Sequence, residues 1–239
     1  GPPDAHCPIC RRVFSARHGM STESYFDWTA RLFDPARIFQ KPEALRGIRV
    51  LDMSIIIFGP ATADYLGELG AEVIRVEMPG GGDVMRIVAP QGFYWKNVSP
   101  AFFAQNHSKY HVSIDLHKPE GQDLIRRLAA KRDILVANYR GGTQARKWGI
   151  GYRQLREINP RLIYCSFSGY GQTGPARNVP GHDINFEARA GILGVAGNRP
   201  GPPLIPGVPM ADLASGFNAA MSVLAALLTR IETGKGEFI

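Results

Sequence analysis

Short apolar runs alternate with amphipathic stretches through most of this chain. The runs are rich in aliphatic and β-branched residues, which predicts strands at 48–53, 72–77, 111–116, 133–137 and 161–168. The stretches between them repeat their apolar positions with helical spacing, which predicts helices at 61–69, 119–131 and 152–158. Strand–helix–strand units of about thirty residues require parallel pairing. The pattern therefore predicts an α/β fold with a doubly wound parallel sheet.

A long apolar helical run, 217–230, follows a carboxylate that lies in a small-residue segment, 207–216. Asp212 is therefore expected at or near a helix N-terminus, where backbone N–H groups and the helix dipole favour an ionised carboxylate. Such a carboxylate can act as a nucleophile or a base. The simpler alternative is that Asp212 is only the N-cap.

The chain divides into three expected parts. Residues 1–19 precede Met20 and are expected to be a tag or an upstream segment. Residues 20–45 are expected to form an amphipathic extension or arm, and 46–239 a single domain. Residues 237–239 resemble the start of a strand, so we expect the natural chain to continue.

Composition narrows the classes of partner. The formal net charge is +7, but the basic residues are dispersed, which fits a few phosphate contacts and disfavours a nucleic-acid surface. We found no apolar run of membrane-span length and no signal-peptide core, so we expect a cytoplasmic protein without a membrane partner. Cys7 and Cys10 form a single pair, and no Gly-x-Gly-x-x-Gly follows the first strand. No metal, NAD or FAD is therefore expected.

Polar and basic side chains occur at several predicted loop positions. Lys109, Arg146 and the run Asn138-Tyr139-Arg140 are candidates for binding phosphate and an aromatic base, with ordinary surface charges as the alternative. His182 is the best general-base candidate because the pKa of histidine lies near neutrality. The alternative is that His182 caps the following helix and Asp183 bonds its first turn.

Many segments, in the same order along the chain, resemble the family III CoA-transferases, the CaiB/BaiF family, which also contains the α-methylacyl-CoA racemases. The matching segments are 45–52, 59–60, 69–77, 80–86, 113–116, 119–121, 138–140, 159–164, 168–175, 207–216 and 233–236. The resemblance implies a Rossmann-like CoA-binding domain at 46–239. It also implies that the family's smaller second domain and C-terminal return are missing from this chain, and that subunits form an interlocked homodimer, with a heteromer as the alternative.

The resemblance also implies site residues. Asp212 matches the family's catalytic aspartate, which attacks an acyl-CoA thioester to form an aspartyl anhydride and then an aspartyl-CoA thioester. Coenzyme A enters as acyl-CoA, and the second substrate is a small carboxylic acid. The same match puts five residues at CoA-contacting positions: Lys109, Asn138, Tyr139, Arg140 and Arg146. A Gln found in oxalate-using members is Ile57 here, which favours a less polar acid.

Three functions remain open. The segment 208–216 resembles the transferase form of the motif, so we expect CoA transfer with Asp212 as nucleophile and His182 as a nearby assistant. The segment 181–185 resembles the racemase motif, in which His182 and Asp212 would be two α-proton bases. The third alternative is a non-catalytic CoA-binding subunit. An apolar acyl pocket is expected to include Phe102, Phe103, Tyr139 and Tyr170.

Overall fold

The computed structural model describes residues 24, 27, 43–89, 92–197 and 200–239. The chain divides into two compact units, Gly1–Gln40 and Lys41–Ile239, and the sheet and helices belong to the second. The expected segment 1–19 and nearly all of the arm at 20–45 lie outside the described residues, so both stay predictions.

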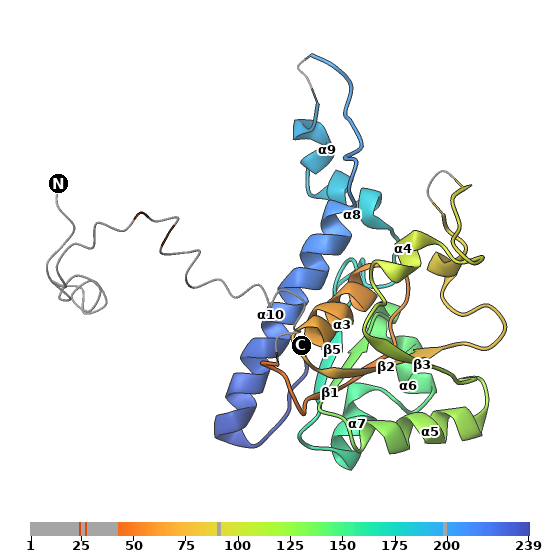
Figure 1. Cartoon of the computed structure of the whole chain (residues 1–239), viewed down its shortest axis with the longest axis vertical. Helices are drawn as coiled ribbons and strands as arrows, with labels where there is room; N and C mark the ends of the chain where they lie inside the picture. Colours follow the sequence, from red (N-terminus) through yellow and green to blue (C-terminus); the bar gives the residue numbers. More distant parts are fainter. Residues whose placement is uncertain (1–23, 25–26, 28–42, 90–91, 198–199) are drawn as a thin grey trace, which may run out of the picture. The chain divides into compact units, whose positions relative to one another are not determined.

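Five parallel strands form one sheet in the order β3-β2-β1-β4-β5 (Figure 1). The strands are β1 (Arg49–Asp52), β2 (Glu72–Glu77), β3 (Lys109–Ser113), β4 (Ile134–Ala137) and β5 (Ile163–Ser166). The central strand β1 pairs with both β2 and β4, and Leu51 lies opposite Ile74 on one side and Leu135 on the other. The predicted α/β fold with a doubly wound, Rossmann-like sheet is confirmed, because the strand order reverses direction between β1 and β4.

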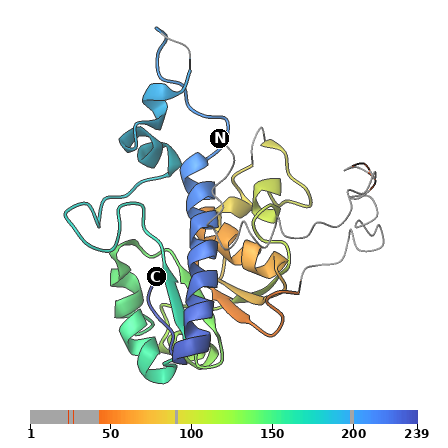
Figure 2. The same ribbon diagram turned by 90° about the vertical axis from the view of Figure 1, so that its left-hand side faces the viewer.

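Helices cover both faces of this sheet (Figure 2). The described helices are α3 (Phe58–Glu68), α4 (Pro100–Phe103), α5 (Pro119–Ala129), α6 (Thr143–Lys147), α7 (Tyr152–Ile158), α8 (Asp183–Arg189), α9 (Ile192–Val195), α10 (Met210–Thr233), and the 3₁₀ turns η2 (Val84–Arg86) and η4 (Arg140–Gly142).

Alternation along each strand divides the core in two. Val50 faces Leu66 of α3 and Val223 of α10, whereas its neighbour Leu51 faces the opposite cluster, which includes Ile125 of α5. Successive strand side chains point to opposite faces, so helices on both sides bury nearly all residues of the inner strands β1 and β4, whereas the edge strand β3 stays partly exposed. Each fully buried aliphatic side chain contributes about 1.5–3 kcal/mol.

Most predicted boundaries agree with these elements to within a few residues, and two strands differ in an instructive way. The strand expected at 111–116 is Lys109–Ser113, and the one expected at 161–168 is Ile163–Ser166. Ile114 and Leu116 are buried and so look strand-like, but the partner strand β2 ends at Glu77, opposite Ser113. Strand length is limited here by the partner strand rather than by hydrophobicity.

Helix α10 is longer than the apolar run that predicted it and packs closely on α3. A Cβ added at Gly216 would lie 2.9 Å from the Phe58 carbonyl oxygen, and the Thr62 hydroxyl donates to the Gly216 carbonyl at 3.0 Å. Against the sequence-based expectation, α10 is long and apolar enough to cross a membrane by length and composition. A core helix passes the same test, and α10 buries the charged residues Asp212 and Arg230 against this unit.

The end of the described chain pairs with β5. Gly234, at φ +69°, ends α10. The Tyr164 N–H donates to the Glu237 carbonyl at 2.8 Å, and the Ile239 N–H donates to the Tyr164 carbonyl at 3.0 Å. The strand-like character expected for 237–239 is confirmed.

Candidate active site

Asp212 is the third residue of α10 and is almost fully buried, with 6% of its surface exposed. The N-cap position belongs to Pro209, which makes no side-chain capping bond. The helix N-terminus expected near Asp212 is confirmed, and the simpler alternative that Asp212 is the N-cap is wrong. Its carboxylate is therefore not used in closing its own helix.

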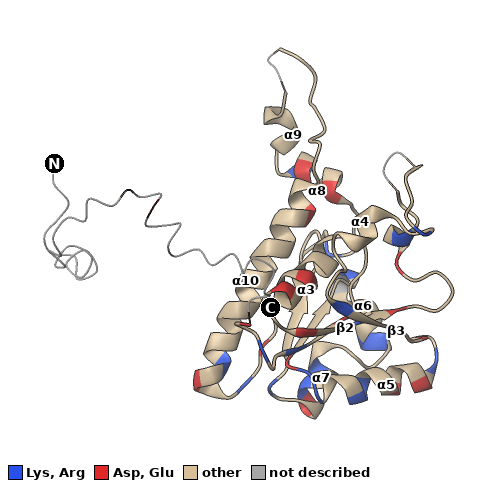
Figure 3. Cartoon of the chain, in the orientation of Figure 1, with Lys and Arg blue, Asp and Glu red and all other residues tan. Residues whose placement is uncertain are grey.

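Two carboxylates of α8 supply the missing caps. The Asp183 Oδ1 accepts a hydrogen bond from the Asp212 N–H at 2.9 Å, and the Glu187 Oε1 accepts one from the Met210 N–H at 3.0 Å. Residues four apart lie on one side of a helix, so both carboxylates reach the first turn of α10. Asp183, Glu187 and Asp212 are called the carboxylate cluster below, and Figure 3 shows acidic segments on α8 and the adjacent end of α10.

His182 occupies the N-cap position of α8 and is exposed. Its backbone N–H donates to the Asn185 Oδ1 at 2.9 Å. The expected capping position of His182 is therefore confirmed. Asp183, expected to bond the first turn of its own helix, bonds the first turn of α10 instead. The two residues expected to act together, His182 and Asp212, are thus linked through Asp183.

The pKa of Asp212 is raised to about 6, chiefly by burial and next by the charge of Asp183. His182 acts in the opposite direction, and Glu187 adds to the increase. Desolvation and like charges both disfavour the carboxylate form. At neutral pH Asp212 is largely ionised but poorly stabilised, which is suitable for a nucleophile or a base.

A small cavity of about 100 Å³ opens beside Asp212. It is lined by Phe58, Phe167, Ser168, Gly169, Phe186, Ala211, Asp212 and Ser215. A Cβ at Gly169 would lie 2.0 Å from the Phe186 ring, so glycine lets that ring close the cavity wall. The buried Ser168 hydroxyl has no hydrogen-bond partner among the described residues. It can therefore donate to an oxygen of a bound group.

The aromatic residues of this cavity are not the ones expected from the sequence. Phe102, Phe103 and Tyr139 do not line it, whereas Tyr170 packs edge-to-face on Phe186 with ring centroids 5.2 Å apart. Phe102 instead lies beneath the Arg86 guanidinium, 3.9 Å from ring centroid to Cζ. Phe167-Ser168-Gly169 lies at the carboxyl end of the strand predicted at 161–168, where ligands collect in such sheets.

Lys109, at the start of the edge strand β3, lies in a second group of charges. Its ammonium donates to the Asp52 Oδ2 at 2.9 Å, the Pro60 carbonyl at 2.8 Å and the Asn106 Oδ1 at 3.1 Å. The ammonium side chain is fully buried. All three ammonium hydrogens have acceptors inside the protein, so the CoA contact expected for Lys109 stays a prediction that this geometry disfavours.

Arg75 is also fully buried and bonds the carboxylates of both Asp52 and Asp83. On the neighbouring side Glu77 bonds Arg86, at 2.7 and 2.8 Å. Asp52, Glu77, Asp83, Arg75, Arg86 and Lys109 are called the balanced cluster below, since three carboxylates meet three cations.

The balanced cluster fixes the loop after β2. Burial acts to raise the pKa of Asp52, but Lys109 and Arg75 outweigh it and hold the pKa below its usual value. The Asp83 N–H donates to the Glu77 Oε2 at 2.9 Å, and the Ile56 N–H donates to the Asp83 Oδ2 at 3.0 Å. The glycine-rich segment before Asp83 is therefore tied at its end to the β1 loop.

The run after β4 is partly used inside the protein. The Asn138 carboxamide bonds the backbone of Ile55 in both directions, at 2.7 and 3.0 Å. Tyr139 is partly buried with its ring against Trp148, and burial raises the pKa of its hydroxyl. Arg140 is exposed and contacts the Asn178 carbonyl at 3.4 Å. Arg140 is thus the one charged residue of the three, and it is exposed.

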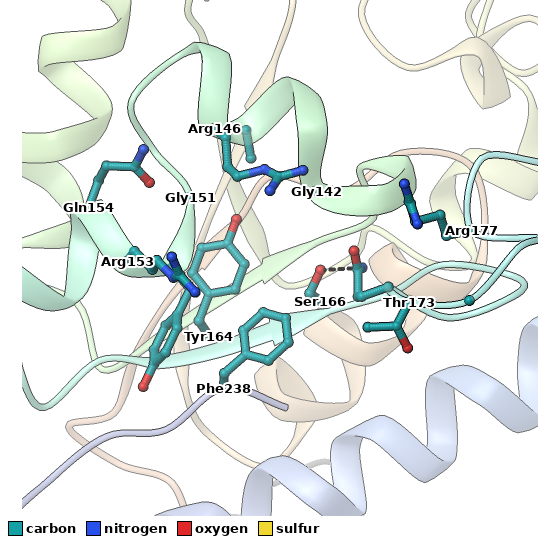
Figure 4. A pocket seen from close by; sticks show the side chains of 14 residues that line it. Gly142, Arg146, Gly151, Arg153, Gln154, Tyr164, Ser166, Thr173, Arg177 and Phe238 are labelled. Atoms are coloured by element: carbon teal, nitrogen blue, oxygen red, sulfur yellow. Dashed lines mark hydrogen bonds between the residues drawn. The ribbon is translucent and has the colours of Figure 1, made fainter.

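A larger cavity, about 590 Å³, lies elsewhere and shares no lining residue with the cavity of Asp212. Figure 4 shows Arg146, Arg153 and Arg177 around it, with the Tyr164 and Phe238 rings against its wall. Ser166 and Gln172 are joined there by a hydrogen bond of 2.7 Å. The structure therefore brings Asp212 and His182 to one end of α10 and leaves Arg146 at a different cavity.

One group of metal-type ligands occurs among the described residues: Asp64, Glu68 and His107. Both ring nitrogens of His107 already lie against carboxylates, at 3.1 Å from Asp64 and 2.7 Å from Glu68. Cys7 and Cys10 lie outside the described residues.

Comparisons with known proteins agree with this geometry. The family model described as CoA-transferase family III matches residues 45–239. Succinyl-CoA:glutarate CoA-transferase of Mus musculus is 39% identical over 212 residues, which are 89% of this chain and 47% of that protein. The beta and alpha subunits of succinyl-CoA–L-malate CoA-transferase of Chloroflexus aurantiacus are 40% and 38% identical; the matches cover 82% and 84% of this chain, and 48% and 46% of those proteins.

Solved structures give the same result. A CaiB/BaiF family protein from Brucella suis superimposes with a TM-score of 0.79 and 35% identity, covering 83% of this chain and 52% of that one. The chain spans about half the length of the curated relatives it matches.

Proposed function

This chain belongs to CoA-transferase family III, and from that premise we propose that it takes part in moving CoA from an acyl-CoA to a carboxylic acid. Asp212 is the nucleophile of the proposed reaction. The supporting observation is its position: a buried carboxylate in the first turn of a long helix, not used as a cap, beside a small cavity with aromatic walls.

The proposed chemistry begins with attack of the Asp212 carboxylate on the thioester carbonyl carbon. A C–O bond forms, the C–S bond breaks, and CoA leaves as a thiolate, which gives a mixed anhydride. The thiolate then attacks the aspartyl carbonyl and releases the donor acid as a carboxylate, leaving an aspartyl-CoA thioester. The acceptor carboxylate repeats both steps in reverse order, so Asp212 is regenerated. Covalent catalysis of this kind divides one difficult exchange into easier steps.

The cavity is suited to the acyl end of the reaction. Three phenylalanine rings exclude water and favour an apolar acyl chain. The Ser168 hydroxyl, which lacks an internal partner among the described residues, can donate to a carbonyl or anhydride oxygen. Ile57 at the β1 loop also favours a less polar acid than oxalate. The relatives are named for glutarate and malate, so dicarboxylates belong in any substrate panel.

Binding of coenzyme A is proposed through its phosphates and its base. Arg140 and Arg146 have exposed side chains after β4 and suit phosphate, whereas Lys109 and Asn138 are engaged within the protein. Tyr139, which lies between Asn138 and Arg140, has an aromatic ring that can contact adenine. We accordingly place the weight of CoA binding on Arg140 and Arg146.

A paired subunit is also proposed. The side of α10 turned away from the sheet exposes an apolar row with helical spacing: Phe217, Met221, Leu228 and Ile231. Exposed apolar rows of this length mark protein interfaces. We propose an interlocked homodimer first and a heteromer as the alternative. The alpha and beta subunits among the relatives support the heteromer. A cytoplasmic location stays a prediction from composition.

A racemase is the second candidate, and one observation favours it. Asp212, with a pKa of about 6, could accept an α-proton, and His182 is joined to it through Asp183. Two bases on opposite faces of an α-carbon would exchange its proton through an enolate. A non-catalytic CoA-binding subunit is the third, and the retained carboxylate at 212 speaks against it.

The test uses the protein that carries this chain, with a panel of acyl-CoA donors, mono- and dicarboxylic acids, and one (R)-2-methylacyl-CoA in deuterated water. Mass spectrometry follows new CoA thioesters and deuterium at the α-carbon. New thioesters, together with a hydroxylamine-sensitive adduct on Asp212, support the transferase. Deuterium without CoA exchange would overturn it in favour of the racemase. If neither new thioesters nor deuterium were detected, the non-catalytic subunit would be favoured.

A further inference from the structure

Glu187 is a fully buried carboxylate that has no part in the reaction proposed above. Its Oε1 accepts a hydrogen bond from the Met210 N–H, and its Oε2 has no hydrogen-bond partner among the described residues. Glu187 does not line the cavity beside Asp212. Burying a carboxylate with one neutral donor is costly, so its place in the fold requires an explanation.

The explanation lies in the start of α10. Pro209 stands at the N-cap and gives no side-chain acceptor, while the first intrahelical bond at this end runs from the Leu213 N–H to the Pro209 carbonyl. The N–H groups of the first turn must therefore find acceptors elsewhere. Glu187 bonds the first helical residue, two positions before Asp212. Its negative charge also lies at the positive end of the helix dipole, which stabilises it there.

Asp212 can attack only if the first turn of α10 is held in one place. Asp183 bonds the Asp212 N–H directly, but one bond permits that turn to tilt about the contact. Glu187 supplies the second point of attachment, and both bonds come from one face of α8. Two attachments fix the direction of the helix start, and with it the direction of the Asp212 side chain.

We propose that Glu187 is a positioning residue for Asp212: it anchors the first turn of α10 through the Met210 N–H and aims the Asp212 carboxylate into its cavity. This inference rests on the proposed function, in which Asp212 is the nucleophile. Glu187 acts through backbone and charge and touches no substrate.

Two substitutions separate the anchor from the charge. Glu187→Gln keeps an acceptor oxygen for the Met210 N–H and removes the charge, whereas Glu187→Met removes both and keeps the volume. Glu157→Gln is the matched control, since Glu157 is exposed at the end of α7. CoA-transfer rates give kcat and KM for each variant in the protein that carries this chain.

A second readout needs no turnover. A water-soluble carbodiimide with an amine modifies protonated carboxyls, and peptide mass spectrometry reports how the modification of Asp212 depends on pH. The charges that act on Asp212 are Asp183, His182 and Glu187. Loss of the Glu187 charge removes one repulsion, so the midpoint for Asp212 is expected at lower pH in Glu187→Gln.

The expected pattern is specific. Glu187→Met lowers kcat about 30-fold or more with KM within about threefold, because misaligned groups can cost about a hundredfold in rate. Glu187→Gln keeps kcat within about fivefold and shifts the Asp212 midpoint, and Glu157→Gln changes neither. Wild-type kcat in a folded Glu187→Met, or an unshifted midpoint in Glu187→Gln, overturns the proposal. If Asp212→Asn retains CoA transfer, the proposed function fails, while the carbodiimide result still reports on Glu187.

Discussion

The balanced cluster and the carboxylate cluster each contain three carboxylates and treat them in opposite ways. In the first, Asp52, Glu77 and Asp83 face two arginines and a lysine, and the pKa of Asp52 lies below its usual value despite complete burial. In the second, Asp183, Glu187 and Asp212 have backbone N–H groups and one exposed histidine nearby, and the pKa of Asp212 rises to about 6.

The difference separates structural charge from reactive charge. A carboxylate bound to buried cations is a poor nucleophile, because its electron pairs are already engaged. A buried carboxylate among like charges has an unfavourable free energy, and other contacts in the fold must offset that cost. Reaction of the carboxylate removes its charge and relieves this unfavourable free energy. Substitutions in the carboxylate cluster are therefore expected to lower activity, and substitutions in the balanced cluster are expected to lower stability.

The largest expected effect is on activity in the carboxylate cluster. Asp212→Asn removes the proposed nucleophile and one of three like charges, so CoA exchange should fall at least about a thousandfold. The melting temperature should stay the same or rise, because a buried charge without a cationic partner has been removed. Thioester formation followed by mass spectrometry, together with a thermal melt, measures both.

Asp52→Asn is the matched control in the balanced cluster. It removes a carboxylate that Arg75 and Lys109 need, so stability should fall. Equal losses of stability in the two variants would show that the clusters do not differ as described.

The second effect is on stability in the balanced cluster. Arg75→Met leaves Asp52 and Asp83 buried without their shared cation, and breaking a buried pair in this way costs about 3–5 kcal/mol. Denaturant unfolding measures the change in free energy. Arg126→Met is the control, since Arg126 and Asp123 form a partly exposed pair 3.7 Å apart that contributes about 0–1 kcal/mol. Comparable losses in both variants would contradict the role given to Arg75.

The third prediction separates the clusters by pH. As the proposed nucleophile, Asp212 must be ionised, so kcat/KM should rise as pH increases through about 6. In stability the signs are opposite. The lowered pKa of Asp52 contributes stability above its unfolded value of 3.8, and this is lost as pH falls further. The raised pKa of Asp212 contributes stability below 3.8 that is lost as pH rises through about 6.

Activity and circular dichroism measured across pH 3–8 check this prediction. Between pH 7 and 5 activity should decline while the dichroism stays constant. Simultaneous loss of both would mean that the fold, and not Asp212, controls the pH dependence.

The fold was largely predictable because strand and helix periods are local. Residues 72–77 and 152–158 were predicted to the residue, since their apolar patterns end at turn residues. Strand β3 was displaced because its ends depend on β2, a partner that sequence spacing does not reveal. Similarly, the apolar run of α10 was visible, but its first turn, 210–213, is stabilised by α8 in three dimensions.

The site was less predictable for the same reason. Asp212 stood out because of its neighbours in sequence. The Lys109 ammonium looked like a free cation, but folding places Asp52, Pro60 and Asn106 around it. Asp52 and Pro60 precede Lys109 in the sequence by 57 and 49 residues. Phe58, Phe167 and Phe186 come from three separate segments and meet only in the folded protein. Glu187 had no signal in sequence beyond its four-residue spacing from Asp183.

The smallest expected effect sharpens the boundary of the reactive region. The Ser168 hydroxyl is buried beside Asp212 without a partner among the described residues, which is unfavourable in the free protein. If it donates to a substrate oxygen, Ser168→Ala should slow CoA transfer about five- to twelvefold, the equivalent of one hydrogen bond of about 1–1.5 kcal/mol. Stability should rise slightly, because the substitution removes the unsatisfied group. Ser215→Ala is the control, since Ser215 lines the same cavity and is exposed. A Ser168→Ala variant that loses stability and keeps its rate would show that Ser168 has a structural role instead. A hydroxyl that bonds only the substrate lowers the stability of the free protein and raises the rate, so its removal should have the opposite effects.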